Sequence, residues 1–183
     1  MQIHLTKKNA LVAGSTQGIG KAAAIELARS GANIILLARN ETALQETLAT
    51  LDTSLGQQHQ YLVADFAKPE SLKGTLQKLD TAVHILINNT GGPAAGQAIT
   101  AQTEDFLQAF QSHLICNQIL VQHCVGAMKQ ESFGRIINII STSVKQPIKG
   151  LGVSNTIRGA VANWAKTLSV ELAPFGITVN NVL

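Results

Sequence analysis

The segment Ala13-Gly14-Ser15-Thr16-Gln17-Gly18-Ile19-Gly20 has the residue types that bind a phosphate group. It follows the apolar run Ala10-Leu11-Val12 and leads into a helical pattern. A strand that passes through glycines into a helix presents unpaired backbone N–H groups and the positive end of the helix dipole. Glycine is needed because a diphosphate must approach the backbone where a Cβ atom would stand. A plain strand-to-helix turn is the alternative, but this context predicts a nucleotide site made by Gly14, Ser15, Thr16, Gln17, Gly18, Ile19 and Gly20.

A histidine and an asparagine interrupt an otherwise apolar stripe in a long predicted helix. The stripe has three-to-four spacing and consists of Phe106, Phe110, His113, Asn117, Leu120, Cys124 and Met128. Buried polar side chains need hydrogen-bond partners, and an imidazole titrates near neutral pH. His113 is thus open to two interpretations, a hydrogen-bonded core residue or a group that supplies a proton in catalysis.

Hydroxyl groups follow a predicted strand at Ser141-Thr142-Ser143. Side chains beyond the carboxyl end of such a strand face the ligand cleft of a doubly wound sheet. Ser141 could therefore bind a substrate carbonyl, or it could cap a turn or a helix. Lys145 and Lys149 lie in the loop that follows, where they either reach the cleft or stay in solvent.

The elements that would position these groups alternate along the chain. Strands are predicted at Asn9–Ala13, Asn33–Ala38, His59–Ala64, His84–Asn88, Gly134–Ile140 and Thr178–Leu183. Helices are predicted at Gly18–Ser30, Glu41–Leu51, Glu70–Leu79, Thr103–Gln130 and Val153–Leu172. Continuous apolar strands are typical of parallel strands covered on both faces, and repeated βα units give right-handed crossovers. We expect an α/β fold, a Rossmann-type doubly wound parallel sheet, in a single domain over residues 1–183.

Composition limits the classes of function. With 45% hydrophobic and 14% charged residues, the 183-residue chain can bury a sizeable core. The net charge of +3 is small and its cations are scattered, which argues against nucleic-acid and membrane partners. Met1–Lys8 lacks the apolar core of a signal peptide, so we expect a cytoplasmic protein. Cys116 and Cys124 are too far apart in one predicted helix for a disulfide and lack metal-ligand spacing, so we expect buried thiols and no metal site.

Several motifs, in this order, resemble the short-chain dehydrogenase/reductase (SDR) superfamily. The first is the G-x-x-x-G-x-G spacing of Gly14–Gly20. The segment Asn88-Asn89-Thr90-Gly91 is similar to the family's Asn-Asn-Ala-Gly after the fourth strand, with Thr90 in place of alanine. Glu171–Asn180 resembles the family's segment before the sixth strand. The likeness is to 3-oxoacyl-(acyl carrier protein) reductases in particular.

The resemblance implies further cofactor contacts. Asp65-Phe66 follows the third predicted strand, where the family has an Asp at the adenine; a strand-end turn is the alternative. Asn89 and Gly91 belong to the family's cofactor motif. In the family, the sixth strand is followed by a substrate loop and one more strand, which residues 1–183 lack. Since the last predicted strand stays apolar to Leu183, we expect that the native protein continues or has been shortened there.

The residues after the second predicted strand bear on the choice of cofactor. An acidic side chain there would accept hydrogen bonds from the adenosine ribose and repel a 2′-phosphate. In this chain Ala38 stands where NAD-preferring SDR members carry Asp, and Arg39 beside it can pair with a phosphate. We expect NADP(H) rather than NAD(H), unless Arg39 is only a solvated residue at a strand end.

The resemblance also implies four catalytic positions. In the family a Tyr transfers the proton, a Lys four residues later lowers its pKa, a Ser positions the substrate oxygen and an Asn helps to hold a water. The matching positions in this chain carry, in the same order, Ser154, Arg158, Ser141 and His113. A serine hydroxyl is a far weaker acid than a phenol, and a guanidinium stays protonated. The family's proton-transfer unit is therefore absent, and Tyr61, the only tyrosine, lies too far upstream to replace it.

These departures leave two hypotheses. The first is an NADP(H)-dependent SDR oxidoreductase that reduces a small carbonyl or acyl-thioester substrate of 3-oxoacyl type, with the carbonyl on Ser141 and the proton from His113 or from a water held by Ser154 and Arg158. The second is a non-catalytic NADP(H)-binding sensor or scaffold. In either case, small and apolar residues on more than one face of the Trp164 helix indicate a homodimer or homotetramer interface, with a buried core helix as the alternative.

Overall fold

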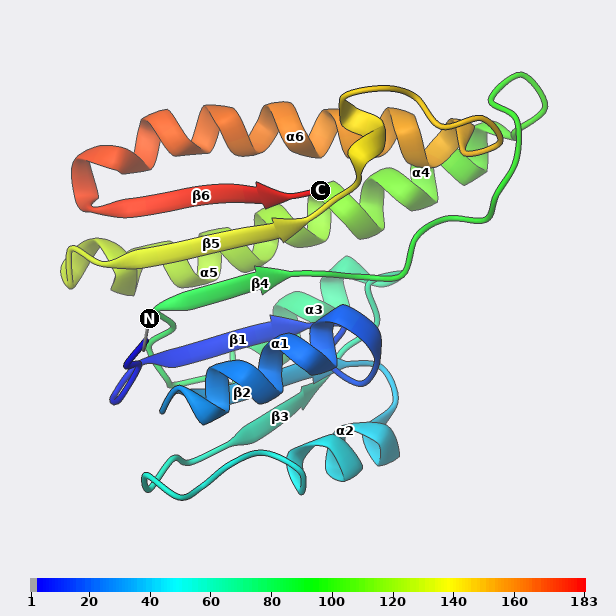
Figure 1. Ribbon diagram of the computed structural model, residues 1–183. Coiled ribbons are helices and arrows are strands. Elements are labelled where there is room, and N and C mark those ends of the chain that lie inside the picture. The colour runs from blue at the N-terminus through cyan, green and yellow to red at the C-terminus, as the bar shows by residue number, and fades with distance from the viewer. Residues whose placement is uncertain (1–2) are drawn as a thin grey trace.

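The computed structural model describes residues 3–183, and its centre is a six-stranded parallel sheet (Figure 1). The strands lie in the order β3-β2-β1-β4-β5-β6. Their bounds are Asn9–Ala13 (β1), Asn33–Ala38 (β2), Gln60–Val63 (β3), Ile85–Asn88 (β4), Gly134–Ile139 (β5) and Ile177–Val182 (β6). The strand order reverses between β1 and β4, and doubly wound folds bind ligands in the crevice at that point. The predicted fold class is confirmed.

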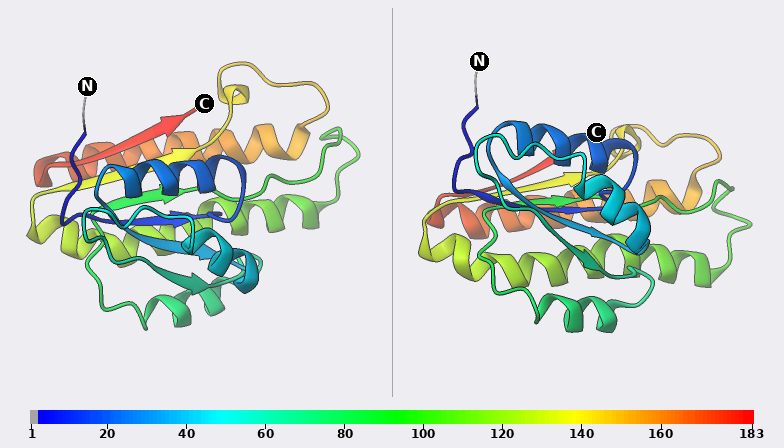
Figure 2. Two further views of the ribbon diagram at one scale, coloured as in Figure 1. Left: turned by 60° about the horizontal axis from the view of Figure 1, so that its bottom comes forward. Right: turned by 90° about the horizontal axis from the view of Figure 1, so that it is seen from below.

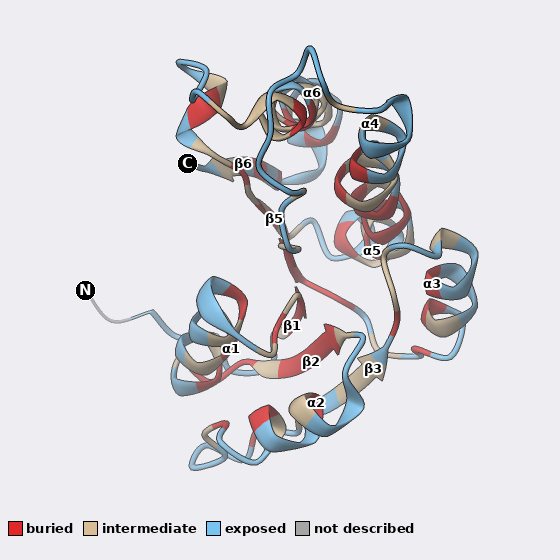
Figure 3. Ribbon diagram, turned by 90° about the vertical axis from the view of Figure 1, so that its right-hand side faces the viewer, coloured by how far each residue is buried: buried red, intermediate tan, exposed pale blue. Residues whose placement is uncertain are grey.

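Helices cover both faces of the sheet (Figure 2, Figure 3). One face carries α1 (Gly18–Arg29) and α2 (Glu41–Leu48). The opposite face carries α3 (Pro69–Leu76), α5 (Cys116–Gln130) and α6 (Gly152–Leu172), and α4 (Thr103–Phe110) precedes α5 in the same long rod. Right-handed crossovers require this division, because the chain moves along the sheet in one direction up to β3 and in the other from β4 onward.

The central strands form the core. Leu11 of β1 lies opposite Ile35 of β2 on one side and Leu86 of β4 on the other, and all three are buried. Burying such a side chain contributes about 1.5–3 kcal/mol. Because helices cover both faces, these strands have no solvent side, which explains why their apolar runs are continuous rather than alternating.

Local signals set the ends of several helices. Asn40 caps α2, since its Oδ1 accepts a hydrogen bond from the Ala43 amide (3.1 Å). Pro69 occupies the first turn of α3, where its missing N–H costs nothing. Gly31, with a φ of 95°, follows the end of α1. The helices α2 and α3 end at Leu48 and Leu76, one turn before the predicted Leu51 and Leu79.

A π-helical segment, η1 (Gln111–Ile115), divides the helix that was predicted to be continuous over Thr103–Gln130. A π turn contains an extra residue, so side chains before and after it do not share one stripe. His113 and Asn117 are buried, but Phe110 is 39% exposed. The predicted stripe is therefore wrong at Phe110.

Both cysteines are free and buried, as predicted. Burial raises the pKa of the Cys116 thiol to about 12, with a smaller contribution from Asp65, and burial raises the pKa of Cys124 to about 12 as well. Thiols with such pKa values are unreactive at neutral pH. Within residues 3–183, no helix has the length and apolar composition needed to span a bilayer.

Candidate active site

The loop between β1 and α1 packs so closely that side chains would not fit. Gly14 and Gly18 have φ angles of 60° and 53°, which glycine adopts without strain. A Cβ atom on Gly20 would overlap the carbonyl oxygen of Gly14 and lie 2.7 Å from the amide nitrogen of Asn89. Asn89 in turn donates from Nδ2 to the carbonyl oxygens of Ala13 (3.3 Å) and Gly14 (3.2 Å). Three glycines and one asparagine thus fix the backbone of this loop.

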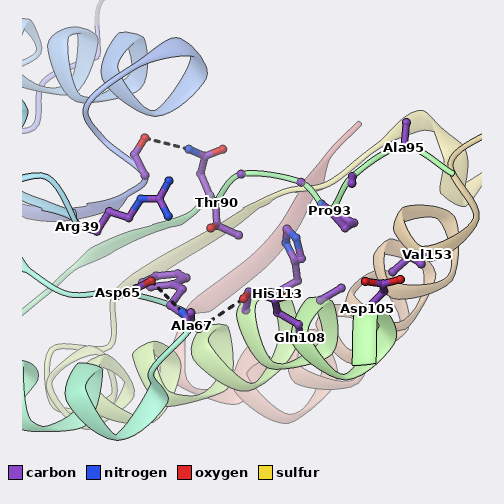
Figure 4. A pocket seen from close by; sticks show the side chains of 18 of the residues that line it. Arg39, Asp65, Ala67, Thr90, Pro93, Ala95, Asp105, Gln108, His113 and Val153 are labelled. Atoms are coloured by element: carbon purple, nitrogen blue, oxygen red, sulfur yellow. Dashed lines mark hydrogen bonds between the residues drawn. The ribbon is translucent and has the colours of Figure 1, made fainter. Parts of the chain in front are cut away.

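The loop lines a cavity of about 860 Å³ at the carboxyl edge of the sheet (Figure 4). Gln17, the N-cap residue of α1, makes no side-chain capping bond, so the first amides of the helix keep their donors for a ligand. The cavity extends from Arg39 and Asp65 at one end, past His113, to Val153 at the other. The predicted site residues that line it are Gly14, Thr16, Gln17, Gly18, Ile19, Arg39, Asp65, Phe66, Asn89, Gly91 and His113.

Two residues predicted to bind the cofactor do not line the cavity. Ser15 is fully buried; its Oγ accepts a hydrogen bond from the Leu37 amide (3.0 Å) and donates to the Leu37 carbonyl (3.4 Å). The hydroxyl fastens the loop to β2, so the prediction of a ligand contact does not hold for the Ser15 side chain. Gly20 is also buried, and its part is to let α1 approach Gly14.

The segment after β3 is held by the helix behind it. Gln111 Nε2 donates to the Ala67 carbonyl (2.7 Å), and Ser112 Oγ donates to the Phe66 carbonyl (3.4 Å). Asp65 Oδ1 accepts from the Ala67 amide (3.0 Å), which gives Asp65 a fixed place in the cavity wall. Sequence reasoning missed Gln111 and Ser112, because both lie in the π segment that it did not predict.

His113 also lies in this π segment, and its ring points from the helix into the cavity (Figure 4). The residue is 2% exposed. Burial lowers its pKa from 6.5 to about 4, with a further contribution from the nearby Arg158 guanidinium. At neutral pH the imidazole is therefore neutral, with one N–H donor and one acceptor nitrogen. It can donate a hydrogen bond to a substrate oxygen, but it is not an imidazolium ion that could transfer a proton as an acid.

Arg158 reaches the same region from α6. Its Nη1 donates to the carbonyl oxygen of Ile139, at the end of β5 (2.7 Å). The side chain is half-buried, and burial lowers the pKa of the guanidinium. If residue 92 had a Cβ atom, this atom would lie 3.9 Å from Arg158 Nη2, so the guanidinium is next to Gly92. Gly92 lines the cavity. Arg158 itself is outside the lining but is flanked by Gly92 and His113, which belong to it.

Ser141 and Ser154 are not among the residues that line the cavity. Ser141 caps the short helix η2 (Thr142–Val144), as its Oγ accepts from the Ser143 amide (3.1 Å). Its hydroxyl hydrogen remains able to donate to a substrate oxygen. Ser154 is half-buried, and it lies four residues before Arg158 and so on the same face of α6. The elements that carry the two serines, η2 with its cap Ser141 and α6 with Ser154, pack against each other.

A row of asparagines, missed by sequence reasoning, ties the strands together near this site. Asn88, Asn138 and Asn181 stand at matched positions of β4, β5 and β6. Asn88 donates from Nδ2 to Asn138 Oδ1 (2.8 Å), and Asn138 donates likewise to Asn181 (3.0 Å). Three asparagines near the ends of apolar strands were the available signal. They join β4 to β6 through β5, and Asn138 directly precedes Ile139, whose carbonyl oxygen accepts a hydrogen bond from Arg158.

Comparison with known proteins agrees with this geometry. The family model described as short chain dehydrogenase matches residues 8–183. The chain belongs to the short-chain dehydrogenase family. An SDR sheet explains why the glycine loop, Asp65 and Asn89 meet at one crevice although they lie far apart in the sequence.

Individual SDR relatives are similar over most of the chain. The NADPH-dependent reductase BacG of Bacillus subtilis (strain 168) is 30% identical over 183 residues, covering 96% of this chain and 70% of the relative. The 3-oxoacyl-[acyl-carrier-protein] reductase FabG of Rickettsia prowazekii (strain Madrid E) is 32% identical over 180 residues, covering 98% and 73%. The crystal structure of L-sorbose reductase from Gluconobacter frateurii, complexed with NADPH and L-sorbose, has a TM-score of 0.92 at 27% identity, covering 99% of this chain and 70% of that one.

Proposed function

We propose that this SDR chain is an NADP(H)-dependent oxidoreductase that reduces a carbonyl of 3-oxoacyl type, with residues 1–183 as its dinucleotide-binding domain. The observation that carries the proposal is the loop in which Gly14, Gly20 and Asn89 pack closely. This loop places the first backbone amides of α1, which no side chain caps, beside a large cavity. Further support comes from relatives that are named NADPH-dependent or were solved with NADPH.

The choice of NADP(H) over NAD(H) rests on the end of β2. Ala38 has no acidic group to accept hydrogen bonds from ribose hydroxyls, and Arg39 is exposed at the same end of the cavity. A guanidinium there can make charge-assisted hydrogen bonds to a 2′-phosphate.

The chain's own residues have to hold the carbonyl and provide a proton. NADPH, when bound, supplies the hydride. Ser141 donates its free hydroxyl hydrogen to the carbonyl oxygen, and the neutral imidazole of His113 donates a second hydrogen bond from the cavity wall. A water held by Ser154 and Arg158 supplies the proton that the missing phenol would have given. General acid catalysis is worth about 10²–10⁴ in rate, and in this proposal the held water makes that contribution in place of the phenol.

The test is an NADPH fluorescence titration followed by an NADPH-consumption assay over ketones, oxo acids and acyl thioesters. Micromolar binding together with consumption supports the proposal, and failure to bind NADPH contradicts it. The double variant Ser154→Tyr with Arg158→Lys then examines the mechanism. We expect its rate to fall, because the wild-type reaction uses the residues that are present; a rate that rises from an undetectable level contradicts this.

A second candidate is an NADP(H)-binding sensor or scaffold without turnover. The observation in its favour concerns Ser141, which is the one family residue retained among the four catalytic positions. Its hydroxyl oxygen already accepts the hydrogen bond that caps η2. NADPH binding without consumption of NADPH by any compound of the panel would favour this candidate over the first.

We further propose that the protein forms a homodimer or homotetramer through the outer side of α4 and α6. An apolar hollow there is lined by Thr103, Phe106, Leu107, Phe110 and Ile157. Leu107 is 68% exposed, so a partner surface would remove much apolar area from water. Trp164, by contrast, is half-buried and donates to Gln118 Oε1 (2.9 Å) within its own chain. Leu107→Glu should lower the mass measured by sedimentation equilibrium, whereas Lys78→Glu, an exposed control outside α4 and α6, should not.

A further inference from the structure

The half-buried guanidinium of Arg158, next to the cavity residues Gly92 and His113, has no acidic partner among residues 3–183. Within the same residues it makes one hydrogen bond, from Nη1 to the Ile139 carbonyl (2.7 Å). The ion pairs found within residues 3–183 are Lys8–Glu131, Arg29–Glu26, Lys73–Glu70 and His84–Glu131. None of them involves Arg158, and its neighbour His113 is neutral at neutral pH. A charge withdrawn from water normally has a counter-charge.

We propose that Arg158 binds the carboxylate of the substrate, so that the substrate class is a free oxo acid rather than an ester, a thioester or a simple ketone. This inference rests on the proposed function and narrows its substrate. A guanidinium has five N–H donors in a planar fork that matches a carboxylate, and one of them is engaged by Ile139. A side chain at position 92 would lie against Nη2, whereas Gly92 leaves the approach from the cavity open.

The spacing along β5 limits the length of the substrate. The guanidinium is held by the carbonyl of Ile139, and Ser141, which we place at the reacting carbonyl, is two residues further along. Two residues of extended chain span about 7 Å. A carboxylate at Arg158 and a carbonyl at Ser141 therefore belong to one short unit, as in a 2-oxo acid or a 3-oxo acid.

The other charged groups around the cavity leave this role to Arg158. Asp65 lies at the opposite end, beside Arg39. Asp105 lies near Val153 (Figure 4), and its Oδ2 accepts from the Gln102 amide at the start of α4 (3.0 Å). Lys145 and Lys149 are exposed in the loop after β5, whereas Arg158 is half-buried beside Gly92 and His113, which line the cavity. A carboxylate that enters beside His113 thus meets one fixed cation.

The first experiment compares acetoacetate with its methyl ester as substrates at saturating NADPH. We expect the acid to have a kcat/KM about 10- to 100-fold above that of the ester, the range expected for hydrogen bonds to a charged group. In Arg158→Gln the kcat/KM for the acid divided by the kcat/KM for the ester should fall to near one. In the matched control Lys149→Met, which removes a nearby exposed cation, the ratio should stay at the wild-type value.

The second experiment measures binding without turnover. Calorimetric titration of the protein–NADP⁺ complex with 3-hydroxybutanoate and with its methyl ester should show the same preference for the acid and the same loss of preference in Arg158→Gln. This measurement decides the question if the wild-type protein reduces neither compound. Titration with NADPH alone is performed for each variant, so that an effect on the cofactor is separated from an effect on the carboxylate.

The outcomes separate this inference from the proposed function. If NADPH does not bind, the proposed function fails. If NADPH binds but acid and ester are treated alike, or if the ratio is unchanged in Arg158→Gln, the inference is overturned and the proposed function stands. If the ratio falls in Lys149→Met instead, the loop recognises the carboxylate and the assignment to Arg158 is wrong.

Discussion

The two ends of the cavity are built by different means. The end beside β1 and β2 depends on backbone, since Gly14 and Gly20 pack together and Asn89 holds their carbonyls. The end beside β5 and α6 depends on side chains, of which His113 and Arg158 differ from the residues usual in the family. A phosphate site made of backbone amides requires glycine at a few positions, because other residues would place a Cβ atom where the backbone and the phosphate approach each other. The proposed proton-transfer site is made of side chains, which can be exchanged while the sheet beneath them stays the same.

The largest effect should follow from removing the His113 donor. Loss of one donor to a reacting carbonyl oxygen typically costs about 10²–10³ in rate. We expect His113→Phe to lower kcat/KM by that amount while NADPH affinity stays within about 2-fold of wild type, because the glycine end is unaffected. His123→Phe, which changes a half-buried histidine of α5 outside the cavity, is the control. Equal loss of NADPH affinity and rate would show that the two ends are not independent.

Stability should depend on pH through the same histidine. The pKa of His113 is about 4 in the folded protein and about 6.5 when unfolded. Between these values the unfolded chain binds more protons, so the free energy of unfolding falls as the pH decreases from 6.5 toward 4. The full contribution is about 3 kcal/mol. Urea unfolding at several pH values should give a steeper decline for wild type than for His113→Phe, and parallel curves would contradict the burial of a neutral imidazole.

The glycine end should respond to a single methyl group. Gly20→Ala places a Cβ against the Gly14 carbonyl and Asn89, and such overpacking typically costs 1–3 kcal/mol. We expect NADPH to bind about 10- to 100-fold more weakly in fluorescence titration. Gly126→Ala in α5, where a Cβ meets no atom within 4 Å, should bind NADPH as wild type does. Unchanged affinity in Gly20→Ala would mean that the diphosphate does not lie on this loop.

The smallest effect concerns cofactor choice. Arg39→Ala removes the cation at the end of β2, and we expect the preference for NADPH over NADH to fall about 10-fold, with NADH affinity unchanged. Arg29→Ala, which removes an exposed arginine paired with Glu26 on α1, should leave the preference as it is. If Arg39→Ala also leaves it unchanged, Arg39 is a solvated residue and the cofactor prediction has lost its basis.

Sequence reasoning predicted the sheet better than the catalytic end, for physical reasons. The strands β1 and β2 were predicted at their observed bounds because their apolar runs are continuous and flanked by turn residues. The π segment at Gln111–Ile115 was not predictable, since its side-chain bonds to Phe66 and Ala67 join residues about 45 positions apart in the sequence.

The contacts of single site residues were equally hidden. Ser15 looked like a ligand contact, but its partner is Leu37 on the next strand. His113 looked like a possible proton donor, but its protonation state depends on burial and on Arg158 from another helix. Local patterns identify which residues gather at the carboxyl edge of the sheet; the hydrogen-bond partners and the pKa values come from tertiary contacts.

Transfer of deuterium tests the account most directly. The protein is incubated with NADPH carrying deuterium at the reactive carbon of the nicotinamide, together with acetoacetate, its methyl ester and an acyl thioester, and the products are analysed by mass spectrometry. The account predicts a hydroxy product with a single deuterium on the former carbonyl carbon, formed fastest from the free acid and about 10²–10³-fold more slowly in His113→Phe. Saturable NADPH binding without labelled product from any of these compounds would contradict it.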